Sequence, residues 1–177
     1  MSVLVLPVSS RDRIQGLDVA PITLVEYGDY QCPKCAESHD IVQHLQQHFG
    51  EQLCFVFRHF PRNHLHPQAQ HAAEAAEAAA RQGKFWQMHD YLFHHQHALG
   101  NGYLAEYADA LGLDVMQFLR DMAAHIYADR VREDLASGIH SGVCQTPTFF
   151  INCLRYDGAC DRQTLTATLK QQLEVNP

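Results

Sequence analysis

The sequence predicts an α/β protein built from a strand–helix–strand unit, a block of helices and a closing strand–strand–helix unit. Apolar strand-like runs at residues 22–27 and 53–58 flank an amphipathic run at residues 33–48. This order and spacing are typical of a βαβ unit with a parallel pair of strands. β-rich residues return only at 148–152, after a long segment with a helical pattern.

The helical block has start and stop signals of its own. An alanine-rich segment lies between Pro67, which fits a first helical turn, and Gly83, which fits a C-terminal stop. Asp114 and Gln117 are spaced like a capping box, and from them we expect one long helix through about residue 137.

The chain closes with a second β segment and a helix. Residues 155–157 follow that segment closely enough to return as a hairpin partner, and Asp161 is placed to cap the last helix. Because the two β segments can join in space, the helical block is an insertion. We therefore expect residues 1–63 and 139–177 to form the two parts of one α/β domain, and residues 64–138 to form the helical insertion.

The composition limits the classes of function. The chain has 177 residues, 46% of them apolar, and a formal net charge of −7 that is spread along the sequence. No basic surface argues for a nucleic-acid partner, and no apolar run approaches the roughly 18 residues of a membrane span. The first residues lack a basic leader, and Pro7 interrupts their apolar run. We therefore expect a cytoplasmic protein, or a periplasmic one if a leader was removed.

The most informative motif is Cys32-Pro33-Lys34-Cys35, which stands between the first strand and the first helix. A cysteine at the first turn of a helix faces unpaired backbone N–H groups and the positive end of the helix dipole, and both lower its pKa. The second cysteine, one turn later, is placed to attack a mixed disulfide formed on the first. Pro33 fits the first turn because its missing N–H costs nothing there.

Metal binding is the main alternative for this cysteine pair. Structural zinc needs four ligands, usually from two such pairs, and the sequence has no second Cys-x-x-Cys. Thirteen histidines are a high count, but His94, His95 and His97 do not share one helix face, so we interpret them as solvated. No motif implies a metal or an organic cofactor.

Several motifs, taken in order, resemble the DsbA-type thiol–disulfide oxidoreductases of the thioredoxin superfamily. They are Glu26 six residues before Cys32, the Cys-x-x-Cys at a strand-to-helix junction, the helical insertion, the closing helix, and Thr146-Pro147 before the second β segment. The resemblance covers nearly the whole chain. It implies a thioredoxin-like fold, βαβ plus ββα, with an inserted α-helical subdomain.

The resemblance also implies catalytic roles. Cys32 matches the attacking cysteine and Cys35 the resolving one. Glu26 matches a buried acid that accepts the proton of the resolving cysteine through water, and burial in an apolar strand would raise its pKa; an outward-facing strand residue is the alternative. Lys34 stands where the family often has histidine and keeps positive charge near Cys32. A solvated surface lysine is an equally good interpretation.

A substrate-binding loop around Thr146 and Pro147 is a further implication of the resemblance. Pro147 matches the family's cis-proline, and Thr146 would offer its backbone to an extended substrate strand, which is a mode of recognition nearly blind to sequence. Pro33 and Lys34 would border the same site. An ordinary edge proline is the alternative for Pro147.

The other cysteines have less certain roles. Cys54 lies in an apolar strand and is expected in the core. Cys144, three residues before Pro147, is either a loop cysteine or a redox-sensitive thiol near the active site. Cys153 and Cys160 flank the expected hairpin, and a disulfide between them fits that geometry but is disfavoured in the cytoplasm.

We therefore expect a protein dithiol–disulfide oxidoreductase that acts on substrate proteins through Cys32 and Cys35, with glutathione or a thioredoxin-like protein as its electron partner. The reduction potential of the pair sets the direction, and a cytoplasmic reductase or isomerase is slightly favoured over an oxidant. The alternative is a peptide-binding, chaperone-like module whose cysteines sense redox state without turnover. A glutathione-conjugating relative is disfavoured, since such proteins typically have serine at the position of Cys32.

Overall fold

The structure, a computed structural model, describes residues 2–175, which divide into two compact units. The sheet unit consists of the described chain up to Gly28, of Glu37–Arg58 and of the chain from Ser137 onward. The helical unit consists of Asp29–Ala36 and His59–Ala136. The helical unit thus covers most of the segment expected to be an insertion, and it also contains the Cys-x-x-Cys motif.

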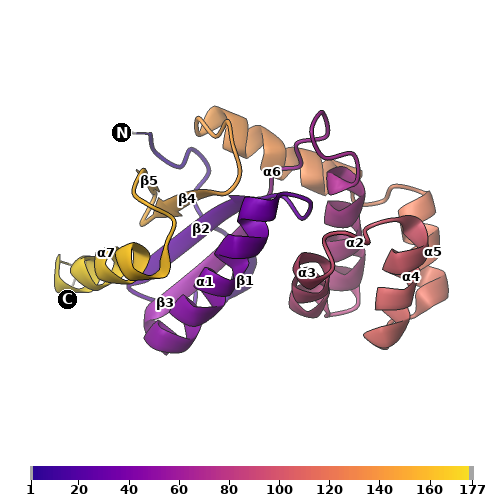
Figure 1. Ribbon diagram of the computed structural model, residues 1–177, viewed down its shortest axis with the longest axis horizontal. Coiled ribbons are helices and arrows are strands. Elements are labelled where there is room, and N and C mark those ends of the chain that lie inside the picture. The colour runs from indigo at the N-terminus through magenta and orange to yellow at the C-terminus, as the bar shows by residue number, and fades with distance from the viewer. Residues whose placement is uncertain (1, 176–177) are drawn as a thin grey trace. The chain divides into compact units, whose positions relative to one another are not determined.

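Within the described residues, the sheet has five strands in the order β1-β3-β2-β4-β5 (Figure 1). They are β1 Arg13–Gln15, β2 Ile22–Gly28, β3 Leu53–His59, β4 Thr148–Ile151 and β5 Leu154–Tyr156. β2 pairs antiparallel with β4, so that Leu24 lies opposite Ile151 and Glu26 opposite Phe149. Every residue of β3 is buried, which explains why its first five residues, 53–57, are a continuous apolar run rather than an alternating one.

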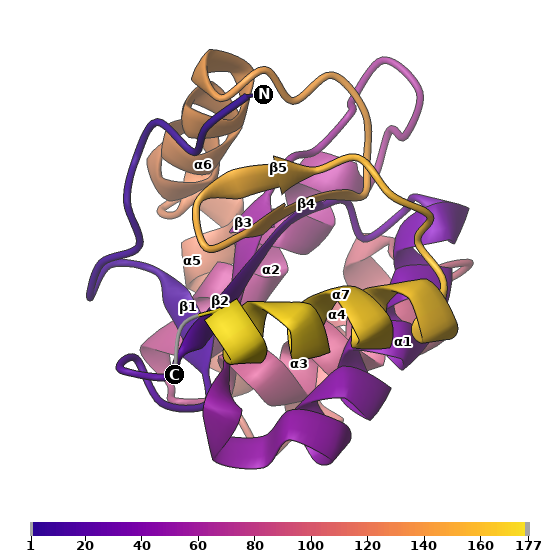
Figure 2. The ribbon, with the colours of Figure 1, turned by 90° about the vertical axis from the view of Figure 1, so that its left-hand side faces the viewer.

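Helices α1 and α7 belong wholly or mostly to the sheet unit; they span Pro33–Phe49 and Arg162–Val175. The buried face of α1 carries apolar residues that include Val42, Leu45 and Phe49. α7 contacts β2 (Figure 2), and its Leu165 and Leu169, at i and i+4, have no exposed surface. Asp161 caps α7 by accepting a hydrogen bond from Thr164 N at 2.8 Å, as the sequence predicts.

A two-residue turn joins β4 to β5, and both of its residues have a left-handed backbone. Asn152 has φ 46° and Cys153 has φ 70°, the pattern of a type I′ hairpin turn. Asn152 suits this conformation, and its Oδ1 also accepts a hydrogen bond from Thr23 N at 2.8 Å. Cys153 suits it less well, because a side chain is disfavoured at positive φ. The hairpin partner is Leu154–Tyr156, one residue earlier than expected.

Arg58 ties the N-terminal segment to the sheet. Its side chain is 3% exposed and bonds both carboxylate oxygens of Asp12, at 2.7 and 3.1 Å, and Tyr27 Oη at 2.9 Å. It also donates to the carbonyls of Leu6 and Pro7. Burial alone would lower the pKa of Arg58, but the hydrogen bonds to Asp12 and Tyr27 outweigh it and raise that pKa. This network secures the short strand β1, which the sequence did not reveal because three residues carry no recognisable period.

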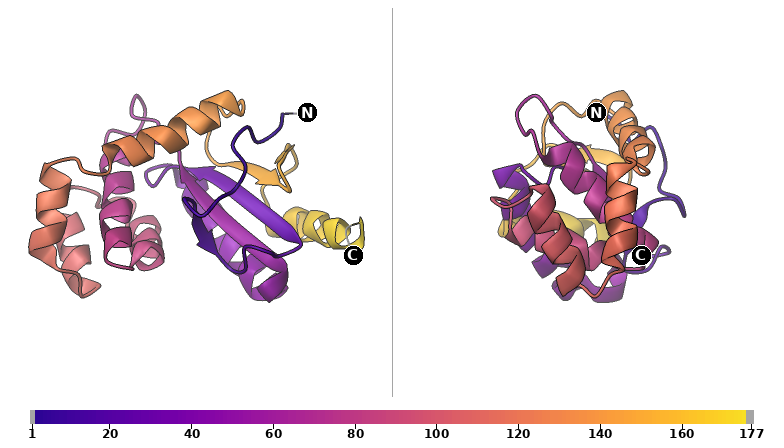
Figure 3. Two further views of the ribbon diagram at one scale, coloured as in Figure 1. Left: turned by 180° about the vertical axis from the view of Figure 1, so that it is seen from behind. Right: turned by 90° about the vertical axis from the view of Figure 1, so that its right-hand side faces the viewer.

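Besides the first residues of α1, five helices lie wholly or mostly in the described helical unit. They are α2 Ala69–Arg81, α3 Phe85–His94, α4 Asn101–Ala110, α5 Val115–Ala123 and α6 Ala128–His140. α2 contacts α3, α4 and α5 (Figure 3), because its alanine-rich surface lets other helices approach closely. No helix in residues 2–175 is both long enough and apolar enough to cross a membrane.

The prediction of one long helix from Asp114 to about residue 137 is wrong. Asp114 does cap α5, but the chain then breaks before α6. At the break His125 has φ 50°, and Ile126 N bonds the carbonyl of Asp121 at 3.1 Å, which is the pattern of a Schellman C-cap. Glycine usually occupies this left-handed position. This position is occupied by histidine instead, so no residue type in the sequence indicates that the helix ends here.

A buried polar cluster surrounds His59 in the helical unit. Its Nε2 lies 2.9 Å from Glu77 Oε1, and its backbone N–H donates to Asp134 Oδ2 at 3.0 Å. Arg130 also bonds Asp134. Burial nevertheless raises the pKa of Asp134 above its ordinary value, since the attraction of His59 and Arg130 does not offset the desolvation.

Replacing Cys153 by glycine should stabilise the protein by about 1 kcal/mol. A side chain at a left-handed position costs roughly 1–2 kcal/mol, and the greater freedom of glycine in the unfolded chain returns part of that gain. Urea denaturation under reducing conditions measures the difference. Cys144→Gly is the control, since Cys144 is not among the residues with positive φ. Equal effects in the two variants would contradict the interpretation of the turn.

The stability that Asp134 contributes should fall as pH rises. Its protonated form fits the fold better, so the contribution is complete below the unfolded-state pKa of about 3.9 and is lost as pH rises through the higher folded-state pKa. Asp134→Asn keeps an oxygen acceptor for His59 N and cannot ionise. Free energies of unfolding, measured between about pH 4 and pH 7, should diverge in favour of the variant as pH rises. Divergence in favour of the unchanged protein would refute this prediction.

Candidate active site

Cys32 and Cys35 lie at the start of α1. Cys32 directly precedes the first helical residue, and its carbonyl accepts hydrogen bonds from Cys35 N at 3.0 Å and Ala36 N at 3.3 Å. Cys32 is 6% exposed and Cys35 is completely buried, and both are thiols in this structure. The N-terminus of α1 favours the thiolate form of a cysteine placed there. The arrangement suits a nucleophile that a substrate can approach and a second thiol that it cannot.

Pro33 and Lys34, between the two cysteines, are exposed. Pro33 is the first residue of α1, the position where a proline leaves no helical hydrogen bond unmade. The exposed lysine is compatible with both of its predicted roles, a positive charge near Cys32 and a solvated surface residue. These two residues therefore form the outer surface of the first helical turn.

The carboxylate of Asp29 holds the loop that leads to Cys32. It is buried and accepts hydrogen bonds from Gln31 N at 2.8 Å, from Arg62 N at 2.9 Å and from His66 Nδ1 at 2.7 Å. The Asp29 carbonyl also accepts from Cys32 N at 3.0 Å. A carboxylate with several donors is strongly held in place. Asp29 is not among the predicted site residues, although an acidic residue between an apolar strand and a Cys-x-x-Cys is a visible signal.

Tyr30 anchors the same loop to α3. Its side chain is 1% exposed, and its ring lies 4.9 Å from that of Phe93 and 5.5 Å from that of His89, centroid to centroid. Tyr30 Oη and His89 Nδ1 form a hydrogen bond of 3.0 Å. Gln96, just beyond α3, donates to the carbonyls of Tyr30 and Cys32. The sequence offered no pattern from which these long-range partners could be found.

Glu26 lies in the sheet unit, on β2. It is 2% exposed, so the alternative of an outward-facing strand residue is excluded. Its Oε1 accepts a hydrogen bond from Ser38 Oγ at 2.9 Å, and Ser38 is itself completely buried on α1. Ser38 is not among the predicted site residues, because a lone serine in a helix carries no signal of a buried acidic partner.

Thr146 and Pro147 also lie in the sheet unit, immediately before β4. The peptide bond between them is cis, the conformation that the resemblance implied. Thr146 is buried, and Thr148, the residue after Pro147, pairs with Tyr27 on β2. The loop thus flanks the end of β2 from which the chain continues to the Cys-x-x-Cys motif. The site residues are divided, with the cysteine motif in the helical unit and Glu26, Thr146 and Pro147 in the sheet unit.

The remaining cysteines are also thiols. Cys54 is buried in β3, and burial raises its pKa, so the prediction of a core cysteine is confirmed. Cys144, Cys153 and Cys160 are exposed, and no disulfide joins the last two. Protein around the Cys160 thiol, helped by the charge of Glu26, raises its pKa to about 11. Cys160 is therefore a poor competitor for Cys32 as a nucleophile at neutral pH.

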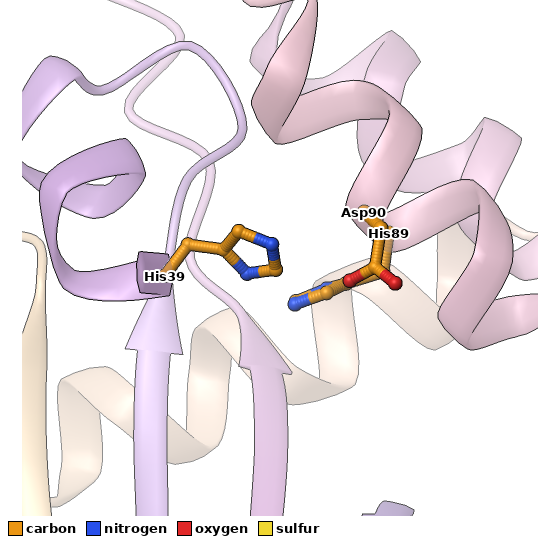
Figure 4. A group of neighbouring side chains, drawn as sticks. All are labelled: His39, His89 and Asp90. Atoms are coloured by element: carbon orange, nitrogen blue, oxygen red, sulfur yellow. The ribbon is translucent and has the colours of Figure 1, made fainter. Parts of the chain in front are cut away.

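In the histidine-rich segment, His94 and His97 are exposed, as expected for solvated side chains, whereas His95 is half-buried. His95 Nδ1 lies 2.8 Å from Tyr91 O. Figure 4 shows His89 and Asp90 on α3, where they are consecutive residues, and His39 on α1. These three belong to different units, His39 to the sheet unit and the other two to the helical unit, and we assign no metal site to them.

Comparison with known proteins identifies the family. The family described as thioredoxin matches residues 9–171, so the chain belongs to the thioredoxin family. It is similar to BdbD from Bacillus subtilis, with a TM-score of 0.87 and 24% identity over 98% of both chains. It is also similar to a thioredoxin-like oxidoreductase from Silicibacter pomeroyi, with a TM-score of 0.82 and 26% identity over 94% of both chains. The thioredoxin-like fold of the DsbA type, predicted from the motifs, is confirmed.

The chain is also similar in sequence to parts of longer curated proteins. The chain is 45% identical over 159 residues to a protein named Na(+)/H(+) antiporter NhaA from Herminiimonas arsenicoxydans, covering 90% of this chain and 25% of that protein. It is 42% identical over 167 residues to Na(+)/H(+) antiporter NhaA 1 from Salinispora arenicola, covering 94% of this chain and 26% of that protein. The chain thus spans about a quarter of the length of the curated relatives it matches.

Replacing Ser38 by alanine should destabilise the protein by about 1–3 kcal/mol, because the buried carboxylate of Glu26 loses a hydrogen-bond donor. Urea denaturation at neutral pH measures the free energy of unfolding. The exposed Ser10→Ala is the matched control and should change stability by less than about 0.5 kcal/mol. If Ser38→Ala changed the free energy of unfolding no more than this control, the hydrogen bond from Ser38 to Glu26 would not contribute to stability.

Proposed function

We propose that this protein is a thiol–disulfide oxidoreductase that exchanges disulfides with substrate proteins through Cys32 and Cys35. The observation that carries the proposal is the position of the two thiols at the N-terminus of α1, one slightly exposed and the other completely buried. Membership of the thioredoxin family supports it.

The reaction proceeds by two thiol–disulfide exchanges. The Cys32 thiolate attacks one sulfur of a substrate disulfide, a mixed disulfide forms, and the other substrate sulfur leaves as a thiolate. Cys35 then loses its proton and attacks the Cys32 sulfur, which releases the second substrate sulfur as a thiolate. The substrate gains two electrons and the enzyme is left with a 32–35 disulfide. The reverse sequence oxidises a dithiol substrate.

Residues of the sheet unit would assist these steps. Glu26 is proposed to accept the proton of Cys35 through water, and the burial of its carboxylate supports such a role. Thr146 and Pro147 are proposed to bind an extended substrate segment through the backbone before β4. Pro33 and Lys34, exposed on the first turn of α1, would border the bound substrate.

The direction of electron flow depends on the partner and the compartment. We propose a cytoplasmic reductase or isomerase, with glutathione or a thioredoxin-like protein supplying electrons, and an oxidant in the periplasm as the alternative. The transport activity in the names of the curated relatives is not proposed for this chain, because the similarity covers only about a quarter of their length.

The reduction potential of the Cys32–Cys35 pair decides the direction. Equilibration in glutathione buffers, followed by alkylation and mass measurement, yields the potential. A value near about −270 mV is expected for a reductant, and a value near about −120 mV would make the protein an oxidant. Failure of the pair to form a disulfide at any poise would refute enzymatic turnover. It would favour a redox-sensing, peptide-binding module.

Single cysteine variants should separate the two roles. Reduced Cys35→Ser should accumulate mixed disulfides when a disulfide-bonded substrate protein is added, because the resolving step is lost. Cys32→Ser should form none and should show no exchange. Mass spectrometry after acid quenching measures both, and Cys54→Ser is the matched control for a buried cysteine. Mixed disulfides that formed equally well in Cys32→Ser would rule out Cys32 as the nucleophile.

A further inference from the structure

Gln96 bonds the backbone of the loop that carries Cys32. Its side-chain Nε2 donates to the carbonyl of Tyr30 and to the carbonyl of Cys32, both at 2.8 Å. The residue follows the end of α3 and is half-buried. A primary amide has two N–H groups, and here both meet carbonyls of the same tripeptide.

The Cys32 carbonyl is an unusual acceptor, because it also receives the first hydrogen bonds of α1, from Cys35 N and Ala36 N. A side-chain donor on this oxygen fixes the peptide group between Cys32 and Pro33. That peptide group in turn fixes where the Cys32 side chain stands relative to the N-terminus of α1. The effect of a helix terminus on a charge falls off within the first turn, so a small displacement of the sulfur matters.

The Gln96 side chain comes from a well-ordered turn. His95 N bonds Tyr91 O at 3.0 Å, and Ala98 N bonds His95 O at 2.8 Å, so the backbone is held on both sides of Gln96. Tyr107 Oη donates to the Ala98 carbonyl at 2.7 Å and fixes the end of the turn. Because its backbone is already held by this turn, Gln96 loses little further conformational freedom when its side chain bonds the Cys32 carbonyl.

We propose that Gln96 is a positioning residue for the nucleophile: by holding the Cys32 carbonyl, it keeps the Cys32 thiolate at the N-terminus of α1 and so sets its reactivity. The proposal deepens the proposed function and rests on it, since it takes Cys32 as the attacking thiol. Gln96 acts through the backbone of Cys32 and does not itself react.

Three variants test the proposal. Gln96→Glu keeps the shape of the side chain, removes both donors at neutral pH and turns a carboxylate towards two carbonyl oxygens. Gln96→Ala removes the side chain altogether. Gln82→Ala is the matched control, because Gln82 is another half-buried glutamine of the helical unit whose Nε2 donates to a backbone carbonyl, that of Asp114 at 3.2 Å.

The first measurement is the rate of alkylation of Cys32 against pH, scored on the peptide that contains it. In both Gln96 variants the midpoint of the profile should move to higher pH by about 0.5 to 1 pH unit. Below that midpoint the alkylation rate should be about three- to tenfold lower than in the unchanged protein. The equilibrium with glutathione should shift towards the 32–35 disulfide by a similar factor, because a less stable thiolate destabilises the reduced form. Gln82→Ala should lower thermal stability and leave both readouts unchanged.

Two results would overturn the proposal. One is a Gln96→Glu variant that folds and keeps the alkylation profile of the unchanged protein. The other is a shift that appears equally in Gln82→Ala, since the effect would then be a general loss of stability. The alkylation profile does not require turnover. If the unchanged protein formed no 32–35 disulfide, the proposed function would therefore fail while the profile still tested Gln96.

Discussion

The buried carboxylate of Asp29 is the contact on which the loop before the Cys-x-x-Cys motif depends. Its two oxygens accept from Gln31 N, Arg62 N and His66 Nδ1. A buried carboxylate is costly unless several donors surround it, and the chain supplies those donors from the loop itself and from the segment after β3. The loop therefore has one favourable conformation, and that conformation delivers Cys32 to the first turn of α1.

The sheet unit is organised around a second buried charge, with the sign reversed. The guanidinium of Arg58 is surrounded by the carboxylate of Asp12, by Tyr27 Oη and by carbonyls of the N-terminal segment. Removing one of these partners is expected to lower the free energy of unfolding by more than the whole network contributes to it. The reason is that the remaining charge stays buried without its partner. Each unit thus holds its backbone with a satisfied buried charge as well as with apolar packing.

Sequence reasoning succeeded where structure follows from local pattern. The apolar runs of β2, β3 and β4 and the caps at Asp114 and Asp161 were all visible in short windows. It failed where a residue adopts a conformation that its type disfavours. His125 adopts the left-handed conformation that ends α5, a position where glycine would have indicated the end of the helix. Strand β1 was missed because three residues are too few to show a period, and its existence depends on pairing with β3.

The sequence by itself determined the class of the protein: the Cys-x-x-Cys at a strand-to-helix junction, the distant Thr146-Pro147 and the order of elements were enough for the family and the fold. Only the tertiary structure decided which polar groups serve these residues. Ser38 bonds Glu26, and the loop of Cys32 is held by Asp29 and Gln96. Each of these hydrogen bonds joins different segments of the chain. Helical and strand periodicity report which face of an element is buried, but they do not report what lies across from it, because that is fixed by packing.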